Sequence, residues 1–167
     1  MSEHAVRRVH PGPGQESVWD YPRPPRVEPT SERVTVELGG VTLVDTTRAV
    51  RVLETSHPPV YYLLRSDFPD AALRWADGTT YCEFKGSARY LDVVGGKAQS
   101  QRAAWFYPDP APGFESLRDR VAVYPAAMDS CRVDEEIVQA QDGGFYGGWI
   151  TSRVVGPFKG APGTRGW

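Results

Sequence analysis

The residues best suited to chemistry lie in one short run, Tyr81-Cys82-Glu83-Phe84-Lys85-Gly86, which combines a thiol, two charged groups and a glycine. A thiolate is a nucleophile, and a neighbouring ammonium group favours its formation. A lysine beside a turn glycine also suits an anion, because glycine lets the backbone approach closely while the ammonium supplies a point charge. The run therefore indicates either a reactive cysteine or an anion-binding lysine.

In an extended chain, side chains two residues apart share a face, and this alternation helps to decide between the reactive cysteine and the anion-binding lysine. It predicts that Cys82 and Phe84 point toward an apolar core. Tyr81, Glu83 and Lys85 are expected on the opposite face, toward solvent or a pocket. Free cysteines are commonly buried. On this geometry Lys85 is the better candidate for function and Cys82 for packing.

Other candidate groups precede this run in the chain. Glu54 ends an alternating segment and suits either a general base or an ion pair with Arg23 or Lys85. His57 suits an acid or base near neutral pH, or is simply a loop residue. Glu54, His57 and Cys82 are thus the catalytic candidates. If their strands lie side by side, the residues expected to line a ligand-binding concavity are Arg23, Glu54, Tyr61, Tyr62, Lys85, Tyr90 and Trp105.

The elements that must position these groups are predicted to be mainly β. Turn signals recur every eight to twelve residues, and no strand alternates with a long helix. Apolar residues alternate over residues 34–38, and Gly39-Gly40 then supplies a hairpin turn. Further strands are expected at residues 41–44, 48–53, 60–64, 80–84, 88–94, 103–107 and 121–124. A short helix is expected over residues 69–75, followed by a turn at Asp77-Gly78, and a single helical turn is expected near residues 114–117. We predict compact antiparallel sheets, as a sandwich or open barrel, with one or two short helices.

Composition divides the chain into three parts. Residues 1–16 are expected to form a flexible arm, and the proline-rich residues 17–29 an extended strap. A single β domain is predicted over residues 17–141, including the strap. Residues 142–167 are rich in glycine and aromatics, which predicts a tail that wraps onto the domain and is a candidate to complete a site or a subunit interface.

Charge and composition exclude several classes of partner. Nineteen basic and 21 acidic residues give a net charge of -2, so we expect no nucleic-acid partner and a small-molecule ligand, in a monomer or homodimer. The sequence has no apolar run of about 20 residues, which argues against a membrane partner. It also shows no signal-peptide pattern, so we expect a cytoplasmic protein. Neither Cys82 nor Cys131 lies in a CxxC motif, and no acidic group has metal-ligand spacing, so no disulfide, metal or cofactor is expected.

Five segments, in their order and spacing, resemble the DUF427 family over about residues 17–134. They are residues 19–25, 53–62, 82–90, Ala104-Trp105 and 121–124. The chain departs from the family where Leu63-Leu64-Arg65-Ser66-Asp67 follows the paired tyrosines, a place where the family tends to have proline and then aspartate. The resemblance implies a compact mainly-β fold, of a tent-like kind in which two antiparallel sheets lean together, and a small bacterial protein that stands alone.

The family's function is unknown, although one label describes it as nucleotidyltransferase-like. This chain lacks the glycine-serine turn and spaced aspartates that metal-dependent nucleotidyl transfer uses. The leading hypothesis is a protein that binds a small polar or anionic molecule in an aromatic-lined β pocket, oriented by Arg23, Glu54 and Lys85. The alternatives are a cysteine-dependent enzyme, in which Cys82 attacks an acyl or similar centre with His57 or Glu54 as base, and a non-enzymatic interaction protein. Whether a reaction is catalysed stays open at this point.

Overall fold

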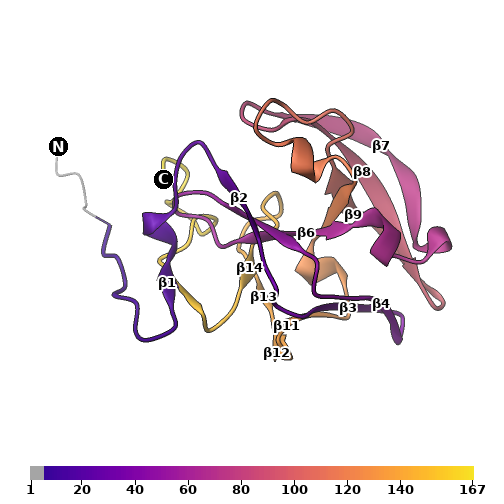
Figure 1. Ribbon diagram of the computed structural model, residues 1–167, viewed down its shortest axis with the longest axis horizontal. Helices are drawn as coiled ribbons and strands as arrows, with labels where there is room; N and C mark the ends of the chain where they lie inside the picture. The colour runs from indigo at the N-terminus through magenta and orange to yellow at the C-terminus, as the bar shows by residue number, and fades with distance from the viewer. Residues whose placement is uncertain (1–5) are drawn as a thin grey trace.

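A seven-stranded antiparallel sheet forms the body of the protein in the computed structural model, which describes residues 6–167 (Figure 1). Residues 1–5 of the expected N-terminal arm lie outside the described residues. In spatial order the strands are β2 (Arg26–Pro29), β5 (Val50–Leu53), β6 (Val60–Leu64), β10 (Arg120–Val123), β9 (Ala98–Phe106), β8 (Gly86–Gly95) and β7 (Leu73–Cys82). Pro29 lies on an edge strand, where its missing N–H breaks no ladder.

A four-stranded antiparallel sheet packs against one face of this body. Its strands, in spatial order, are β12 (Glu136–Ile137), β11 (Ser130–Val133), β3 (Val34–Leu38) and β4 (Val41–Thr46). Gly39 and Gly40 have φ of 62° and 75°, the left-handed pair that a two-residue hairpin turn requires, so the predicted hairpin is confirmed. The described strands are mainly antiparallel and close no barrel, and the helical segments among them are short 3-10 turns, as the mainly-β prediction expected.

Alternation gives the seven-stranded sheet two different faces. One face carries Leu63, Leu91 and Val121, which pack with Val34 and Val36 of the smaller sheet into the largest buried core. The opposite face carries a second buried cluster, rich in aromatic side chains. Its strand residues include Val52, Tyr62, Ala88, Tyr90, Trp105 and Ala122. The second face is therefore available for a site, because the smaller sheet covers only the first.

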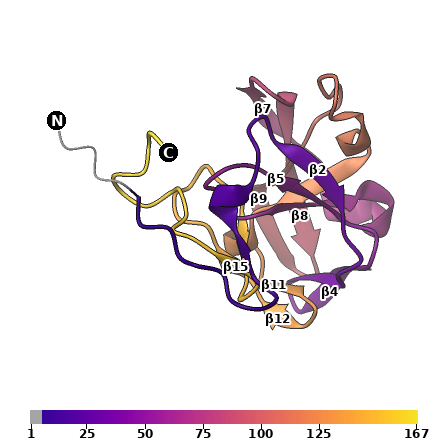
Figure 2. The same cartoon turned by 60° about the vertical axis from the view of Figure 1, so that its left-hand side comes forward.

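Both ends of the described chain lie at the same end of the molecule (Figures 1 and 2). Strand β1 (Glu16–Ser17) pairs in parallel with β15 (Val154–Val155), and β13 (Gln139–Ala140) pairs with β14 (Trp149–Ile150). Trp149 is fully buried within the largest core. The C-terminal segment therefore supplies part of the core itself.

The predicted helix over residues 69–75 is wrong. The helical segments are single 3-10 turns, at Val18–Asp20 (η1), Arg65–Asp67 (η2), Asp70–Ala72 (η3), Glu115–Leu117 (η4) and Pro125–Ala127 (η5). Strand β7 begins at Leu73 and continues through the predicted turn at Asp77-Gly78, which becomes an irregularity in the register with β8. Pairing with β8 overrides the weak helical propensity of this segment.

Among residues 6–167, no helical segment has the length and apolarity needed to cross a membrane.

Candidate functional site

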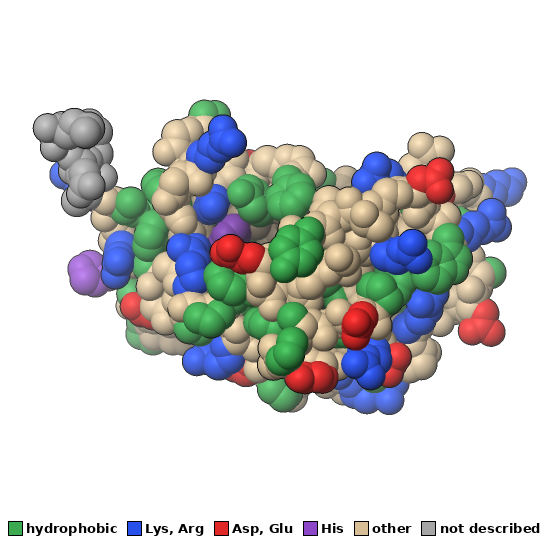
Figure 3. Space-filling view, turned by 90° about the horizontal axis from the view of Figure 1, so that it is seen from above, with side chains coloured by type: hydrophobic (Ala, Val, Ile, Leu, Met, Phe, Trp, Pro, Cys, Tyr) green, Lys and Arg blue, Asp and Glu red, His purple; other side chains and the backbone are tan. Residues whose placement is uncertain are grey.

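A cavity of about 300 Å³ opens on the second face of the seven-stranded sheet. Its floor comes from alternate residues of neighbouring strands, because side chains two positions apart share a face. Those floor residues are Val52, Val60, Tyr62, Thr80, Cys82, Ala88, Tyr90 and Trp105. The segments at residues 54–58, 83–85 and 141–147 form the walls. Seen from above, hydrophobic side chains gather near the middle of the molecule, with Lys and Arg side chains on both sides (Figure 3).

The aromatic floor is held by its own hydrogen bonds and ring contacts. Trp105 Nε1 donates to the Tyr62 hydroxyl at 3.2 Å, and the Trp105 ring lies 4.6 Å from that of Tyr124. Burial raises the pKa of both the Tyr62 and Tyr107 hydroxyls. These hydroxyls therefore stay protonated and can donate hydrogen bonds to a ligand.

Lys85 reaches the cavity because the chain turns back immediately after Cys82. Cys82 pairs with Gly86, so residues 83–85 form the turn between β7 and β8. The prediction that Cys82 and Lys85 occupy opposite faces is therefore wrong, since alternation holds only while the strand continues. Gly86 has φ of 107°, a conformation that glycine adopts without strain, and both side chains line the same cavity.

The ammonium group of Lys85 stays charged although it is largely enclosed. Burial by itself would lower the pKa of Lys85, but the groups around it outweigh burial and raise this pKa; among them, the Glu54 carboxylate carries a negative charge at neutral pH. Within residues 6–167, no carboxylate oxygen lies within 4.0 Å of this ammonium nitrogen, which faces the Tyr107 ring at 6.0 Å from its centroid. A charged donor is thus available to an anion.

His57 links the cavity wall to the C-terminal tail. The Gln141 Oε1 accepts from the Gly148 N–H at 3.1 Å and the Gln141 Nε2 donates to the Lys159 carbonyl at 2.6 Å, which together fix the orientation of the amide. The His57 Nδ1, 3.3 Å from Gln141 Nε2, is therefore an acceptor. In the neutral ring the proton then lies on Nε2, which is 3.4 Å from Glu54 Oε2.

The Glu54 carboxyl group, at the rim of the cavity, is ionised. Burial by itself would raise the pKa of Glu54, but His57, Lys85 and Arg23 outweigh burial and lower it. Arg23 Nη2 lies 3.5 Å from Glu54 Oε2 and also donates to the carbonyls of Thr55 and Trp167. Arg23 therefore holds the rim, and it contributes no side chain to the cavity lining.

Replacement of Glu54 by glutamine should change the acid dependence of stability. A carboxylate whose pKa is lowered by folding stabilises the protein above its ordinary pKa, about 4.5, and this contribution is lost as pH falls through the folded-state pKa. We expect Glu54→Gln to be less stable than the wild type at pH 7, and the gap to shrink below that ordinary value. Urea unfolding across this range measures the gap, and a constant gap would contradict the assignment. Glu83→Gln, at an exposed position, controls for the loss of one negative charge.

Tyr61, which was expected to line the concavity, and Cys131 both lie away from the cavity. Tyr61 points to the opposite face of β6 from Tyr62, where its hydroxyl donates to Glu32 at 2.9 Å. Cys131 lies in the largest core, and burial raises the pKa of its thiol to about 12. Of the residues expected to line a concavity, the structure brings Glu54, Tyr62, Lys85, Tyr90 and Trp105 around one cavity, together with the catalytic candidates His57 and Cys82.

Sequence reasoning proposed that the C-terminal tail completes a site, but it named none of the cavity residues that follow residue 140. Gln141, Phe145, Tyr146, Gly147 and Lys159 all line the cavity, as do Tyr107 and Tyr124 from the sheet. A Cβ atom at Gly147 would lie 2.2 Å from the Trp105 ring, so only glycine lets the tail pass so close to the floor. The glycine and aromatic content of the tail was the available signal, but composition does not indicate which face the tail covers.

Comparison with protein families gives one match. A family model described as a domain of unknown function (DUF427) matches residues 26–134, which is more than half of the chain. No curated protein matches the chain. The matched segment contains most of the cavity floor, whereas the walls from residues 141–147 and Lys159 lie beyond it.

Proposed function

The chain belongs to the DUF427 family, whose function is unknown, and we propose that it binds a small anionic molecule in the aromatic-lined cavity with Lys85 as the anchor. The observation that carries this proposal is the Lys85 ammonium, which is charged, largely enclosed and free of any carboxylate within 4.0 Å among residues 6–167. A charged donor in a partly desolvated cavity attracts an anion more strongly than one in open water. The cavity volume, about 300 Å³, is at the small end of the range for ligand sites.

The remaining groups take roles that suit binding. Flat aromatic rings from Trp105 and Tyr107 offer apolar contact, and the neutral Tyr62 and Tyr107 hydroxyls offer hydrogen bonds. Arg23 and Glu54 hold the rim in position. An anionic group on Lys85 would place its neighbouring atoms beside Cys82, since both residues line one cavity.

The geometry favours binding over thiol catalysis with His57 as base. The His57 Nδ1 is occupied by Gln141, and Nε2, which lies 3.4 Å from Glu54 Oε2, carries the proton, so the neutral ring has no free lone pair for the Cys82 thiol. Glu54 is a weak base because its pKa is lowered. The ring therefore serves to join two segments of the wall.

Alkylation of Cys82 tests whether the cavity selects anions. Iodoacetate and iodoacetamide are similar in size and differ in charge, so the ratio of their rates at Cys82 reports the local potential. We expect Lys85→Met to lower this ratio by about tenfold or more, since tenfold corresponds to only about 1.4 kcal/mol of attraction. Mass spectrometry of the labelled peptides gives both rates.

Two controls belong to this experiment. Lys97→Met removes an exposed lysine that does not line this cavity, and it should leave the ratio unchanged. Cys131, which is 1% exposed, should stay unlabelled and so reports that the protein remains folded. If Lys85→Met leaves the ratio at the wild-type value, Lys85 does not anchor anions and the proposed function fails.

A further inference from the structure

A second cavity adjoins the first and extends it along the sheet. It has a volume of about 550 Å³. Six residues line both cavities: Thr80, Tyr90, Tyr124, Gln141, Phe145 and Tyr146. Because the shared residues include both the sheet floor and the tail, the two cavities lie side by side and meet at Phe145 and Tyr146, and together they are called the groove below.

The far part of this groove contains one cationic group. Arg102 is the one charged residue that lines the second cavity in the described part of the chain, and none of the lining residues there is acidic. Its guanidinium lies over the Tyr90 ring at 4.5 Å from the centroid. No carboxylate oxygen among residues 6–167 lies within 4.0 Å of its nitrogens, so the charge is available to a ligand.

A local distortion of β9 directs Arg102 to this position. The register of β8 with β9 shifts between Leu91 and Val93, and Arg102 has φ of 49°, an uncommon conformation for a residue other than glycine. The Arg102 backbone N–H donates to the Asp92 carboxylate at 2.8 Å, which holds the distortion. Strained residues of this kind concentrate at ligand sites.

We propose that the natural ligand is elongated and carries two anionic groups, one bound by Lys85 and the other by Arg102, joined by an apolar middle. The middle segment would lie on Tyr90 and on the paired rings of Trp105 and Tyr124. The inference rests on the proposed function, because it assigns the first anionic group to Lys85. It adds a second subsite and the chemical class of ligand, an elongated dianion.

A series of aliphatic α,ω-dicarboxylates of increasing chain length, each compared with the monocarboxylate of the same length, tests the second subsite. Isothermal titration calorimetry measures each Kd. At the length that spans the groove, the dicarboxylate should bind about tenfold more tightly than its monocarboxylate. Arg102→Met should abolish this advantage, whereas Lys85→Met should weaken the binding of both acids.

Arg89→Met is the matched control. Arg89 is also an exposed arginine of the same sheet region, but its guanidinium lies over Trp75 and lines neither cavity. Arg89→Met should leave the dicarboxylate binding about tenfold more tightly than the monocarboxylate of the same length. If the advantage is missing at every length or survives Arg102→Met, the two-anion ligand is excluded while single-anion binding at Lys85 stands. If Lys85→Met leaves monocarboxylate binding unchanged, or if no acid binds, the proposed function fails as well.

Discussion

Trp149→Ala is expected to lower the free energy of unfolding by about 3–5 kcal/mol, the usual cost of deleting a large buried aromatic side chain. The Trp149 side chain is fully buried, and its ring lies 4.9 Å from that of Tyr61. Its indole N–H donates to the Val123 carbonyl at 3.4 Å, so truncation also leaves a buried acceptor without its partner. Urea unfolding measures the loss.

Phe145→Ala is the control for this prediction. Phe145 belongs to the same C-terminal segment but its side chain is 62% exposed, so its truncation should change stability by no more than about 0.5 kcal/mol. Trp149 lies outside the family-matched residues 26–134. A large loss for Trp149→Ala alone means that the core of this protein extends beyond that segment, whereas equal small effects would mean that the tail is dispensable for stability.

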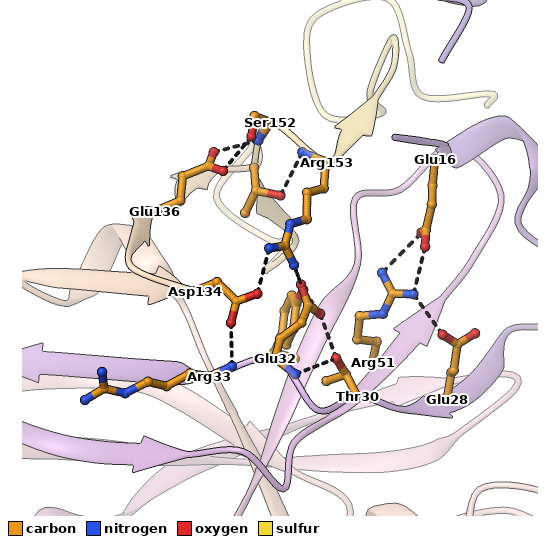
Figure 4. Close-up of polar contacts among 12 residues, drawn as sticks. Glu16, Glu28, Thr30, Glu32, Arg33, Arg51, Asp134, Glu136, Ser152 and Arg153 are labelled. Atoms are coloured by element: carbon orange, nitrogen blue, oxygen red, sulfur yellow. Dashed lines mark hydrogen bonds and ion pairs between the residues drawn. The ribbon is translucent and has the colours of Figure 1, made fainter. Parts of the chain in front are cut away.

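Arg51→Met is expected to cost about 2–3 kcal/mol at neutral pH, because hydrogen bonds between charged groups are worth about 1.5–3 kcal/mol. Arg51 is a buried cation whose Nη1 and Nη2 each lie 3.1 Å from a carboxylate oxygen of Glu16 (Figure 4). Nη2 also donates to Glu28 at 2.9 Å. The guanidinium thus joins the N-terminal segment to strands β2 and β5, and methionine of similar length would leave both carboxylates without it.

The pH dependence of this loss provides a second readout. Burial alone would raise the pKa of Glu16, but hydrogen bonds from Arg51 and Tyr21 outweigh burial and lower it. Stabilisation from a lowered carboxyl pKa is present above the ordinary value of about 4.5 and disappears as pH falls through the folded-state pKa. The difference between wild type and Arg51→Met should therefore shrink in acid.

A matched variant and a double-mutant cycle distinguish this pair from ordinary surface ion pairs. The Arg26 side chain is 58% exposed and pairs with Glu28 at 3.2 Å, so Arg26→Met should cost less than about 1 kcal/mol. Combining Arg51→Met with Glu16→Gln should cost less than the sum of the two single changes, because they remove the same contact. Strict additivity, or a loss that is constant with pH, would show that the pair does not couple these segments.

Local patterns predicted the strands and hairpin but failed where pairing partners decide the outcome. The hairpin at Gly39-Gly40 is local, because two consecutive glycines with positive φ define the turn. The segment 69–75 contains helix-favouring residues, yet Leu73 and Trp75 pair with Val93 and Leu91 of β8. That partner is distant in sequence, so propensity could not show it.

The residues of the site likewise divide into those that local alternation predicts and those that depend on distant segments. Tyr61 and Tyr62 were both expected at the concavity, but adjacent strand residues must face opposite ways, and only Tyr62 lines the cavity. Alternation misplaces Lys85, since the strand ends at Cys82 and the turn reverses the direction of the side chain. Gln141 and Lys159 reach the cavity only through long-range contacts of the tail.

By itself, the sequence determined the mainly-β class, the hairpin, the family and four of the eight residues on the cavity floor, because all of these depend on the period of a strand or on short motifs. Only the tertiary structure decided that Cys82 and Lys85 share one cavity, that Gly147 lets the tail lie against Trp105, and that Arg102 extends the groove. These features depend on which distant segments pack together, and the free energy of that packing comes from burial shared across the whole chain.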